Sequence, residues 1–379
     1  MVNAPQLALS GERFVVGYRL AAADRAEAHQ LASALCVEQT VEFPLDLIGP
    51  GPIREQVVGQ VRSLEEAGEG AFVARVSYAV ETAGDDLTQL LNVIFGNSGL
   101  KPGIVVSELN LSEGLLARSC GPRFGVAGLR ARLGVKERPL LCTAIKPMGL
   151  SPRQLAAMAR EMALGGVDLI KDDHGLVDQP FCPFEERVTR VAEAVQEANA
   201  LSGCHTLYVA NGTSDARHRL GRWAFARDAG VGALMLAPGL MGFDVVQQLA
   251  MDDSFELPIL AHPAWLGASL ERVAGGVAHG VLLATLMRLA GADATIFPNH
   301  GGRFSFSPEQ CRSIVKSCHE GLGELAPILP VPAGGMRLEN VGELRTFYGD
   351  DAMFLIGGDL HREDDLRGAC ARFVELVSG

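Results

Sequence analysis

The feature that most restricts the fold of this chain is an eightfold alternation of short apolar runs and amphipathic segments that begins near residue 138. Each run ends in glycine, proline, asparagine or charged residues before the amphipathic segment follows. The predicted strands are residues 140–145, 167–170, 206–210, 233–237, 258–261, 294–297, 328–332 and 353–356. Eight strand–helix units in succession are the plan of a (β/α)8 TIM barrel, whose functional groups gather where the strands end. We therefore expect a catalytic barrel over residues 136–379.

Residues 1–135 carry a different pattern, which predicts a smaller α+β domain of the ferredoxin-like type. Residues 13–20 and 71–80 have strand composition, residues 24–35 have helical spacing, and residues 85–96 with the loop that follows close this part. A chain of 379 residues, 48% of them hydrophobic, can bury the cores of both a barrel and a second domain. The predicted fold class is α/β, with an N-terminal α+β domain followed by the barrel.

Composition restricts the partners and the compartment. The formal charge of −12 argues against nucleic acid or an anionic membrane surface as a partner. Eight cysteines include no CxxC pair, which indicates reduced thiols rather than a disulfide framework. The N-terminus has no basic segment followed by an apolar core, and no apolar run approaches membrane-spanning length. We expect a soluble cytoplasmic protein.

The densest group of reactive side chains is the run from Lys171 to His174, directly after the second predicted strand. Along an extended backbone, Lys171 and Asp173 point to one side and Asp172 to the other. Asp173, His174 and Lys171 could share a divalent cation only if CO2 converted the lysine into an anionic carbamate, which is an oxygen donor suited to Mg²⁺. Taken alone, these four residues are explained more simply as a salt-bridged strand end.

Other strand ends also carry candidate site residues. These are Lys146, Asn211, His262, His300, Arg303 and the glycine pairs Gly334-Gly335 and Gly357-Gly358. Glycine pairs after the seventh and eighth strands are where such barrels commonly bind a phosphate through backbone N–H groups. Lys146 or His262 could transfer protons, with His300 as a weaker candidate, although a surface lysine and a packed core histidine explain the first two equally well.

The sequence resembles the ribulose-bisphosphate carboxylase/oxygenase (RuBisCO) large chain over nearly its whole length. KDDHGLVDQPF is similar to the family's KDDENVNSQPF, TAIKPMGL is similar to its TIKPKLGL, and VPAGGM and FLIGGD keep the glycines of one phosphate site. The resemblance implies one Mg²⁺ per site, held by a carbamylated Lys171, by Asp173 and by His174 in place of the family's glutamate. It also implies that Lys146 is the enolising base and that His262 is the family's active-site histidine.

Three departures from the family separate this chain from a CO2-fixing enzyme. Pro263 replaces the arginine beside the active-site histidine, the family's loop histidine falls near Ile296, and Arg303 lies near the position of the loop lysine. The lost groups serve a second phosphate and the new carboxylate, and an arginine has a different donor geometry from a lysine. The resemblance is therefore to the RuBisCO-like proteins (form IV) and implies a sugar substrate with a single phosphate.

Enzymes of this group share an enolate and differ in its fate. We expect a metal-dependent lyase or hydrolase that decarboxylates or cleaves a 3-oxo sugar-acid phosphate of the 3-oxo-isoapionate 4-phosphate type, because Arg303 can pair with a second anion. Decarboxylation also yields an enolate directly. One alternative is a methionine-salvage enolase or isomerase of 5-methylthioribulose 1-phosphate, which needs two proton-transfer groups and an apolar pocket. The other is a non-catalytic binding or regulatory protein.

The resemblance also implies a homodimer with an active site shared between subunits. In the family, a glutamate and an asparagine of the N-terminal domain complete the partner's barrel. Glu38 lies near the place of that glutamate, and Asn92 or Asn97 near that of the asparagine. Composition alone indicates only a solvated loop carboxylate at Glu38.

Overall fold

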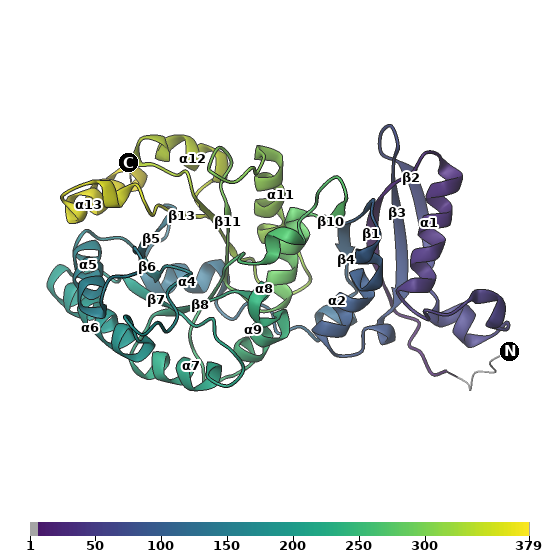
Figure 1. Ribbon diagram of the computed structural model, residues 1–379, viewed down its shortest axis with the longest axis horizontal. Helices are drawn as coiled ribbons and strands as arrows, with labels where there is room; N and C mark the ends of the chain where they lie inside the picture. Colours follow the sequence, from purple (N-terminus) through teal and green to yellow (C-terminus); the bar gives the residue numbers. More distant parts are fainter. Residues whose placement is uncertain (1–6, 379) are drawn as a thin grey trace.

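The carboxyl-terminal part of the chain forms a closed barrel of eight parallel strands in this computed structural model, which describes residues 7–378 (Figure 1). The barrel strands are β5 (Leu140–Ile145), β6 (Leu169–Asp172), β7 (Leu207–Asn211), β8 (Ala233–Leu236), β9 (Ile259–Ala261), β11 (Ala294–Pro298), β12 (Leu329–Ala333) and β13 (Met353–Leu355). All eight predicted strands are confirmed, and β13 pairs with β5 to close the barrel.

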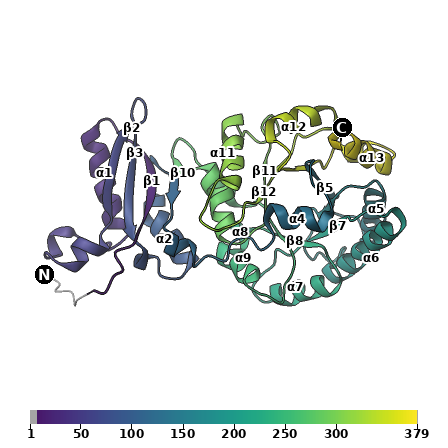
Figure 2. The same ribbon diagram turned by 180° about the vertical axis from the view of Figure 1, so that it is seen from behind.

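The barrel strands read as continuous apolar runs because both of their faces are covered. β5 is buried at every position, with Leu140 and Cys142 in an inner cluster and Leu141 and Ile145 packed against the surrounding helices. Leu129 of α4 (Gly125–Leu133) joins the inner cluster, and Figure 2 shows α4 lying across one end of the barrel. The barrel interior is therefore a packed core that leaves the opposite mouth for a site.

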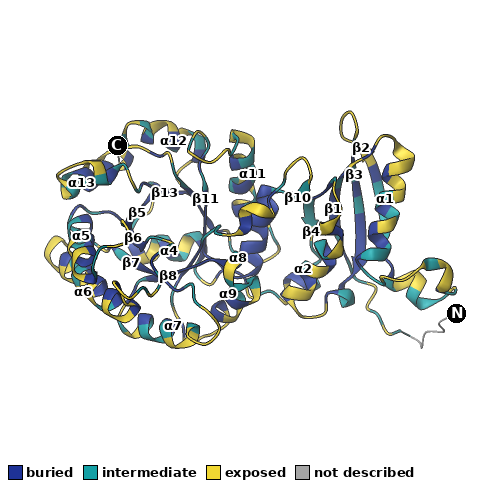
Figure 3. Cartoon of the chain, in the orientation of Figure 1, coloured by how far each residue is buried: buried dark blue, intermediate teal, exposed yellow. Residues whose placement is uncertain are grey.

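Helices surround the barrel and turn their buried faces toward the strands, as the colours in Figure 3 show. They are α5 (Pro152–Leu164), α6 (Phe184–Ser202), α7 (Arg219–Asp228), α8 (Pro238–Met241), α9 (Phe243–Ala250), α10 (Leu286–Leu289), α11 (Pro308–His319), α12 (Val341–Tyr348) and α13 (Leu366–Ser378). The two predicted helix starts are confirmed. Ser151 and Ser307 each accept the backbone N–H of a glutamine at the third helical position, and each glutamine side chain bonds back to close a capping box.

The N-terminal part is a five-stranded sheet with the order β10-β4-β1-β3-β2. Its elements are β1 (Arg13–Ala21), α1 (Arg25–Glu38), β2 (Gln60–Glu66), β3 (Ala71–Ala79), α2 (Leu87–Phe95), β4 (Ile104–Asn110), α3 (Glu113–Leu116) and β10 (Gly275–Val277). The predicted elements at residues 13–20, 24–35 and 71–80 are confirmed, while α2, β2 and β4 were not predicted.

The strand β10 comes from the barrel half of the sequence and pairs in parallel with β4. Its glycines allow a close approach, because a Cβ atom at Gly275 would lie 2.8 Å from the carbonyl oxygen of Ile104. The backbone at Gly275 also has a φ of 132°, which side chains rarely adopt. This strand therefore joins the two parts of the chain through a pairing that no local pattern announces.

Two expectations from composition can be compared with the structure. All eight cysteines lie within residues 7–378 and have free thiols. In the same residues, no helix combines the length and the apolar character needed to cross a membrane.

Candidate active site

A pocket of about 800 Å³ opens at the carboxyl ends of the barrel strands, a size typical of small-molecule sites. Among the predicted site residues, its wall contains Lys146, Lys171, Asp173, His174, His262, Arg303, Gly334, Gly335, Gly357 and Gly358. These residues come from the ends of six different strands and from the loops that follow them. Asn211, His300 and Glu38 do not line this pocket.

The centre of the pocket wall is the end of β6. Lys171 is 4% exposed, its amine donates to the carbonyl oxygen of Asp172 at 2.8 Å, and burial lowers its pKa. Asp173 lies beside it, with its carboxylate oxygens 3.2 Å from Nζ of Lys146 and 2.8 Å from Nδ1 of His174. The hydrogen bond from His174, with the nearby Lys146 charge, holds the pKa of Asp173 well below its usual range. Asp173 is therefore ionised and faces two lysines.

Two imidazole rings stack at one side of this group. The rings of His174 and His262 are almost parallel, with centroids 4.7 Å apart and an interplanar angle of 9°. Burial, followed by the nearby Lys171 charge, lowers the pKa of His262 to about 3. The backbone N–H of Ala264 donates to Nδ1 of His262 at 3.2 Å, so the neutral ring carries its proton on Nε2. His262 is thus arranged as a hydrogen-bond donor.

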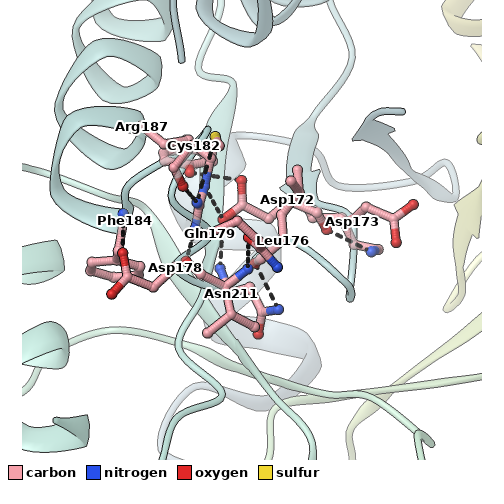
Figure 4. Close-up of polar contacts among 12 residues, drawn as sticks. Asp172, Asp173, Leu176, Asp178, Gln179, Cys182, Phe184, Arg187 and Asn211 are labelled. Atoms are coloured by element: carbon pink, nitrogen blue, oxygen red, sulfur yellow. Dashed lines mark hydrogen bonds and ion pairs between the residues drawn. The ribbon is translucent and has the colours of Figure 1, made fainter. Parts of the chain in front are cut away.

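Behind the pocket, Asp172 points away from Lys171 and Asp173, as strand alternation predicted. Asp172 and Arg187 are both fully buried and form an ion pair, with Nε of Arg187 3.2 Å from Oδ2 (Figure 4). The Tyr208 hydroxyl donates to Oδ1 at 2.9 Å, and the backbone N–H of Asn211 donates to Oδ2 at 2.9 Å. The buried carboxylate therefore ties β6, β7 and α6 together directly beneath the site.

Asn211 continues this network into the loop after β6. Its side-chain amide donates to the carbonyl oxygens of His174 at 2.9 Å and of Leu176 at 3.0 Å. Asn211 is only 1% exposed, so the structure places it behind the pocket rather than in its wall, where the sequence had placed it. Its contacts fix the course of the loop that carries His174.

The glycines after β12 and β13 make room for other groups. Gly334 and Gly335 have φ angles of 85° and 73°, and a Cβ atom at Gly335 would lie 2.5 Å from Cα of Gly302. A Cβ atom at Gly357 would lie 3.4 Å from Nζ of Lys146. The first pair thus brings two loops into backbone contact, and the second borders the Lys146 amine.

His300 and Glu38 lie elsewhere. The His300 ring packs on Phe347 of α12 at a centroid distance of 4.4 Å, and its Nε2 is buried with no hydrogen-bond partner among residues 7–378. Glu38 ends α1, which lies on the side of the N-terminal sheet that faces away from the barrel (Figure 1). It accepts a hydrogen bond from Asn97 at 3.3 Å, whereas the Asn92 side chain donates to Gln89. Within one chain, Glu38 is remote from the pocket.

The sequence reasoning missed two groups of pocket residues. The cations Arg337 and Arg362 follow the two glycine pairs and also line the pocket. An apolar wall is formed by Trp265, Leu270, Phe304, Phe306 and Met336. The side chain of Arg303 lies over the ring of Phe304, 4.8 Å from its centroid. The tryptophan in HPAW, four residues after a predicted strand, was a sequence signal for one of these residues but not for the wall as a whole.

The donor set can be compared with what a divalent cation needs. Among residues 7–378, no three His, Cys, Asp or Glu side chains converge as a metal site. Asp173 and His174 supply two donors, and Lys171 can supply a third only as a carbamate. CO2 reacts with a neutral amine, and the lowered pKa of Lys171 favours that form. The residues therefore fit a cation that is bound after carbamylation.

Fold and site together define a TIM-barrel enzyme whose mouth joins a lysine–carboxylate–histidine group to glycine-lined loops. The family model described as the RuBisCO large chain, catalytic domain, matches residues 125–372. The chain is 44% identical to ribulose bisphosphate carboxylase-like protein 1 of Rhodopseudomonas palustris, over 97% of this chain and 98% of that protein. It is 40% identical to 5-methylthioribulose-1-phosphate isomerase of Rhodospirillum rubrum, over 92% of each.

A solved structure of a RuBisCO-like protein from Rhodopseudomonas palustris superposes with a TM-score of 0.88 at 41% identity, and the match covers 97% of each chain. The chain belongs to the RuBisCO large-chain family, among the RuBisCO-like proteins (form IV), and is not an authentic carboxylase. The resemblance read from the sequence is thus confirmed, as is the enolase-type class of enzyme to which the chain belongs.

Proposed function

We propose that this chain isomerises a mono-phosphorylated ketose through an enediolate, with 5-methylthioribulose 1-phosphate as the substrate. The observation that carries the proposal is the mixed lining of the pocket. It combines Lys146, Asp173 and the glycine loops with the apolar side chains of Trp265, Leu270, Phe304, Phe306 and Met336. The relative from Rhodospirillum rubrum, named for this isomerisation, supports the same choice.

The apolar wall favours a methylthio tail over a sugar acid. Burying one methyl or methylene group is worth about 0.8 kcal/mol, whereas a hydroxyl or carboxylate placed there would lose its water without a partner. The wall includes Leu270, Phe306 and Met336, whose side chains have no charge to offer an anion. These side chains support a substrate with an apolar tail.

Proton transfer and stabilisation of the ketone oxygen are assigned to two side chains. Lys146, once neutral, removes a proton from the carbon beside the ketone and returns it to the neighbouring position, which leaves the composition of the substrate unchanged. His262 donates a hydrogen bond from its Nε2–H to the ketone oxygen as negative charge develops there and keeps its proton, and its low pKa keeps the ring neutral. Asp173, at 3.2 Å, orients the Lys146 amine before the substrate binds.

One Mg²⁺ would be held by carbamylated Lys171, Asp173 and His174. When bound, it supplies Lewis-acid stabilisation of the enediolate oxygens. The loop that carries His174 is held from behind by Asn211, so these donors are ordered in advance. The phosphate is assigned to the backbone of Gly334, Gly335, Gly357 and Gly358, with Arg337 and Arg362 beside it.

The 3-oxo sugar-acid phosphate, which the sequence had favoured, becomes the second candidate substrate. Arg303 supports it, because its guanidinium lies in the pocket wall and can pair with a carboxylate. The same Lys171 group would serve this reaction, since loss of CO2 also leaves an enolate.

A carbon-13 and phosphorus-31 NMR time course with each substrate, Mg²⁺ and bicarbonate separates the candidates. The isomerase proposal expects a new ketose phosphate from 5-methylthioribulose 1-phosphate without release of CO2, and no reaction by Lys171→Ala. Release of CO2 or of two fragments from 3-oxo-isoapionate 4-phosphate, with the methylthio sugar unchanged, would replace it with the sugar-acid reaction. Binding without turnover of either compound would indicate a binding protein.

We propose further that the active enzyme is a homodimer in which Glu38 and Asn97 complete the partner's pocket. The remoteness of Glu38 from the pocket of its own chain supports this arrangement (Figure 1). Mixing inactive Glu38→Gln with inactive Lys171→Ala tests it, because a mixed dimer regains one intact site. Random exchange would restore about a quarter of the wild-type sites. No recovery after verified subunit exchange would contradict a shared site.

A further inference from the structure

The most unusual residue in the pocket wall is Trp265. Its backbone has a φ of 72°, in the left-handed region that non-glycine residues rarely adopt. Its side chain is nevertheless 78% exposed, although a tryptophan normally buries most of its surface. It lines the same pocket as Leu270 and Phe304. Neither core packing nor turn chemistry explains a large indole at this position.

The turn that carries Trp265 is held on both sides. The backbone N–H of Ala264 donates to His262, and the N–H of Leu266 donates to the carbonyl oxygen of Pro263 at 3.1 Å. A Cβ atom added at Gly239 would lie 2.5 Å from the Ala264 oxygen, so the loop after β8 packs closely against this turn. Such surroundings hold an unfavourable backbone conformation in place, and conformations of this kind gather at functional sites.

The connection to His262 gives the turn a defined place relative to the chemistry. His262 and Trp265 are three residues apart. The His262 ring stacks on His174, which contacts Asp173, so His262 lies beside the Asp173 group. The indole therefore lines the same pocket as the Asp173 group and is largely open to solvent. A substrate bound at the end of β6 would share the pocket with this indole.

We infer that Trp265 is a specificity-determining residue that covers the apolar substituent of the substrate. The inference rests on the proposed function, in which that substituent is the methylthio group of 5-methylthioribulose 1-phosphate. The indole gives a flat apolar surface with little conformational freedom to lose, and a thioether sulfur makes favourable contacts with aromatic rings. A 5-hydroxyl group in the same place would gain neither contact.

The test compares 5-methylthioribulose 1-phosphate with ribulose 1-phosphate, which carries a hydroxyl group in place of the methylthio group. Binding is measured by calorimetry in a Lys171→Ala background, where no turnover is expected to disturb the titration. We expect the methylthio compound to bind roughly 10- to 100-fold more tightly than ribulose 1-phosphate, which is the discrimination that a small apolar group typically gives. Adding Trp265→Ala should remove most of this preference, and Trp265→Phe should keep part of it.

Fluorescence gives an independent readout, because the chain has two tryptophans. Trp223 is 1% exposed and its ring N–H donates to the carbonyl oxygen of Gly212, so its emission should not respond to a ligand. Emission of Trp265 should shift to the blue with the methylthio compound and much less with ribulose 1-phosphate. The shift should be absent in Trp265→Phe.

Each outcome bears on the inference. A methylthio preference that survives Trp265→Ala would overturn the role of Trp265 and leave the proposed substrate intact. Failure of both compounds to bind would overturn the substrate together with the inference. Blue emission that depends on protein concentration and not on ligand would show that a second copy of the chain covers Trp265, and would also overturn it.

Discussion

Replacing Asp172 with asparagine should loosen the site from behind without touching the pocket wall. The side chain keeps its size, so no cavity is created, but Arg187 loses the only carboxylate that pairs with it among residues 7–378. Removing one partner from a buried ion pair typically costs about 3–5 kcal/mol, because the remaining charge is left uncompensated. We expect the free energy of unfolding to fall by about that amount.

The new amide also conflicts with its surroundings. Oδ2 of Asp172 accepts from both Arg187 and the backbone N–H of Asn211, while Oδ1 accepts from Tyr208. An asparagine with its NH2 group in the place of Oδ2 faces the N–H donors of Arg187 and Asn211. Turned the other way, its NH2 group can donate to the Tyr208 oxygen, but the Tyr208 hydroxyl then loses its acceptor. An N–H left without an acceptor costs about 1–3 kcal/mol, which is already included in part in the loss of the ion pair. Asn211 loses the acceptor of its backbone N–H in one of the two orientations, and Asn211 is the residue that holds the loop of His174.

Asp168→Asn is the matched control at the opposite end of the same strand. Asp168 pairs with Arg138 through contacts of 2.7 and 2.8 Å, but the Arg138 side chain is 17% exposed and water can reach it. We expect a loss of about 1–3 kcal/mol for this variant. Because Asp168 lies at the amino end of β6, its replacement should leave the pocket unchanged.

Two assays separate stability from site geometry. Urea denaturation followed by Trp223 fluorescence gives the loss of stability for both variants. Calorimetric titration with Mg²⁺ in the presence of bicarbonate gives the cation affinity, which should fall about 10- to 100-fold for Asp172→Asn only, as it does when groups that orient metal ligands are removed. Equal cation affinity in wild type and Asp172→Asn would refute the reasoning, even if the variant were less stable.

Three further outcomes follow from single residues. Lys171→Ala should abolish turnover and leave the fold intact, as checked by activity and by thermal unfolding. Residual turnover above roughly a tenth of the wild-type rate would contradict a carbamate of Lys171 that is needed for the reaction. Gly335→Ala should lower the free energy of unfolding by about 1–2 kcal/mol from its φ of 73° alone. It should also weaken phosphate binding, measured by calorimetry with inorganic phosphate. Gly342→Ala, which has open space around it, should do neither. Burial lowers the pKa of His279, so below about pH 6.5 the unfolded chain binds a proton at this histidine that the folded protein does not bind. The free energy of unfolding should therefore fall with decreasing pH by up to about 1.4 kcal/mol per pH unit from this group. His279→Leu should show a smaller dependence of stability on pH in urea denaturation at pH 5 to 7.

The sequence by itself determined the barrel. A strand that is buried on both faces needs apolar residues throughout, so each of the eight strands is visible as an apolar run that ends at the first polar residues. All eight barrel strands were predicted, and so was the opposite orientation of Asp172 and Asp173. The opposite orientation follows from the period of two along an extended backbone. The candidates that follow strand ends directly, such as Lys146 and His262, reached the pocket for the same reason, since the carboxyl ends of parallel strands meet at one mouth.

Tertiary structure alone decided the features that depend on contacts between distant segments. β10 is three residues long and exists through its pairing with β4, far away in the sequence. Asn211 and His300 follow strands as the pocket residues do, yet one turns behind the loop of His174 and the other packs on α12, because neighbouring side chains compete for the same space. The apolar wall and the exposure of Trp265 come from loops whose relative positions no local pattern contains. Strand periodicity is a property of adjacent residues, whereas the walls of this pocket are set by packing among loops that are far apart in the sequence.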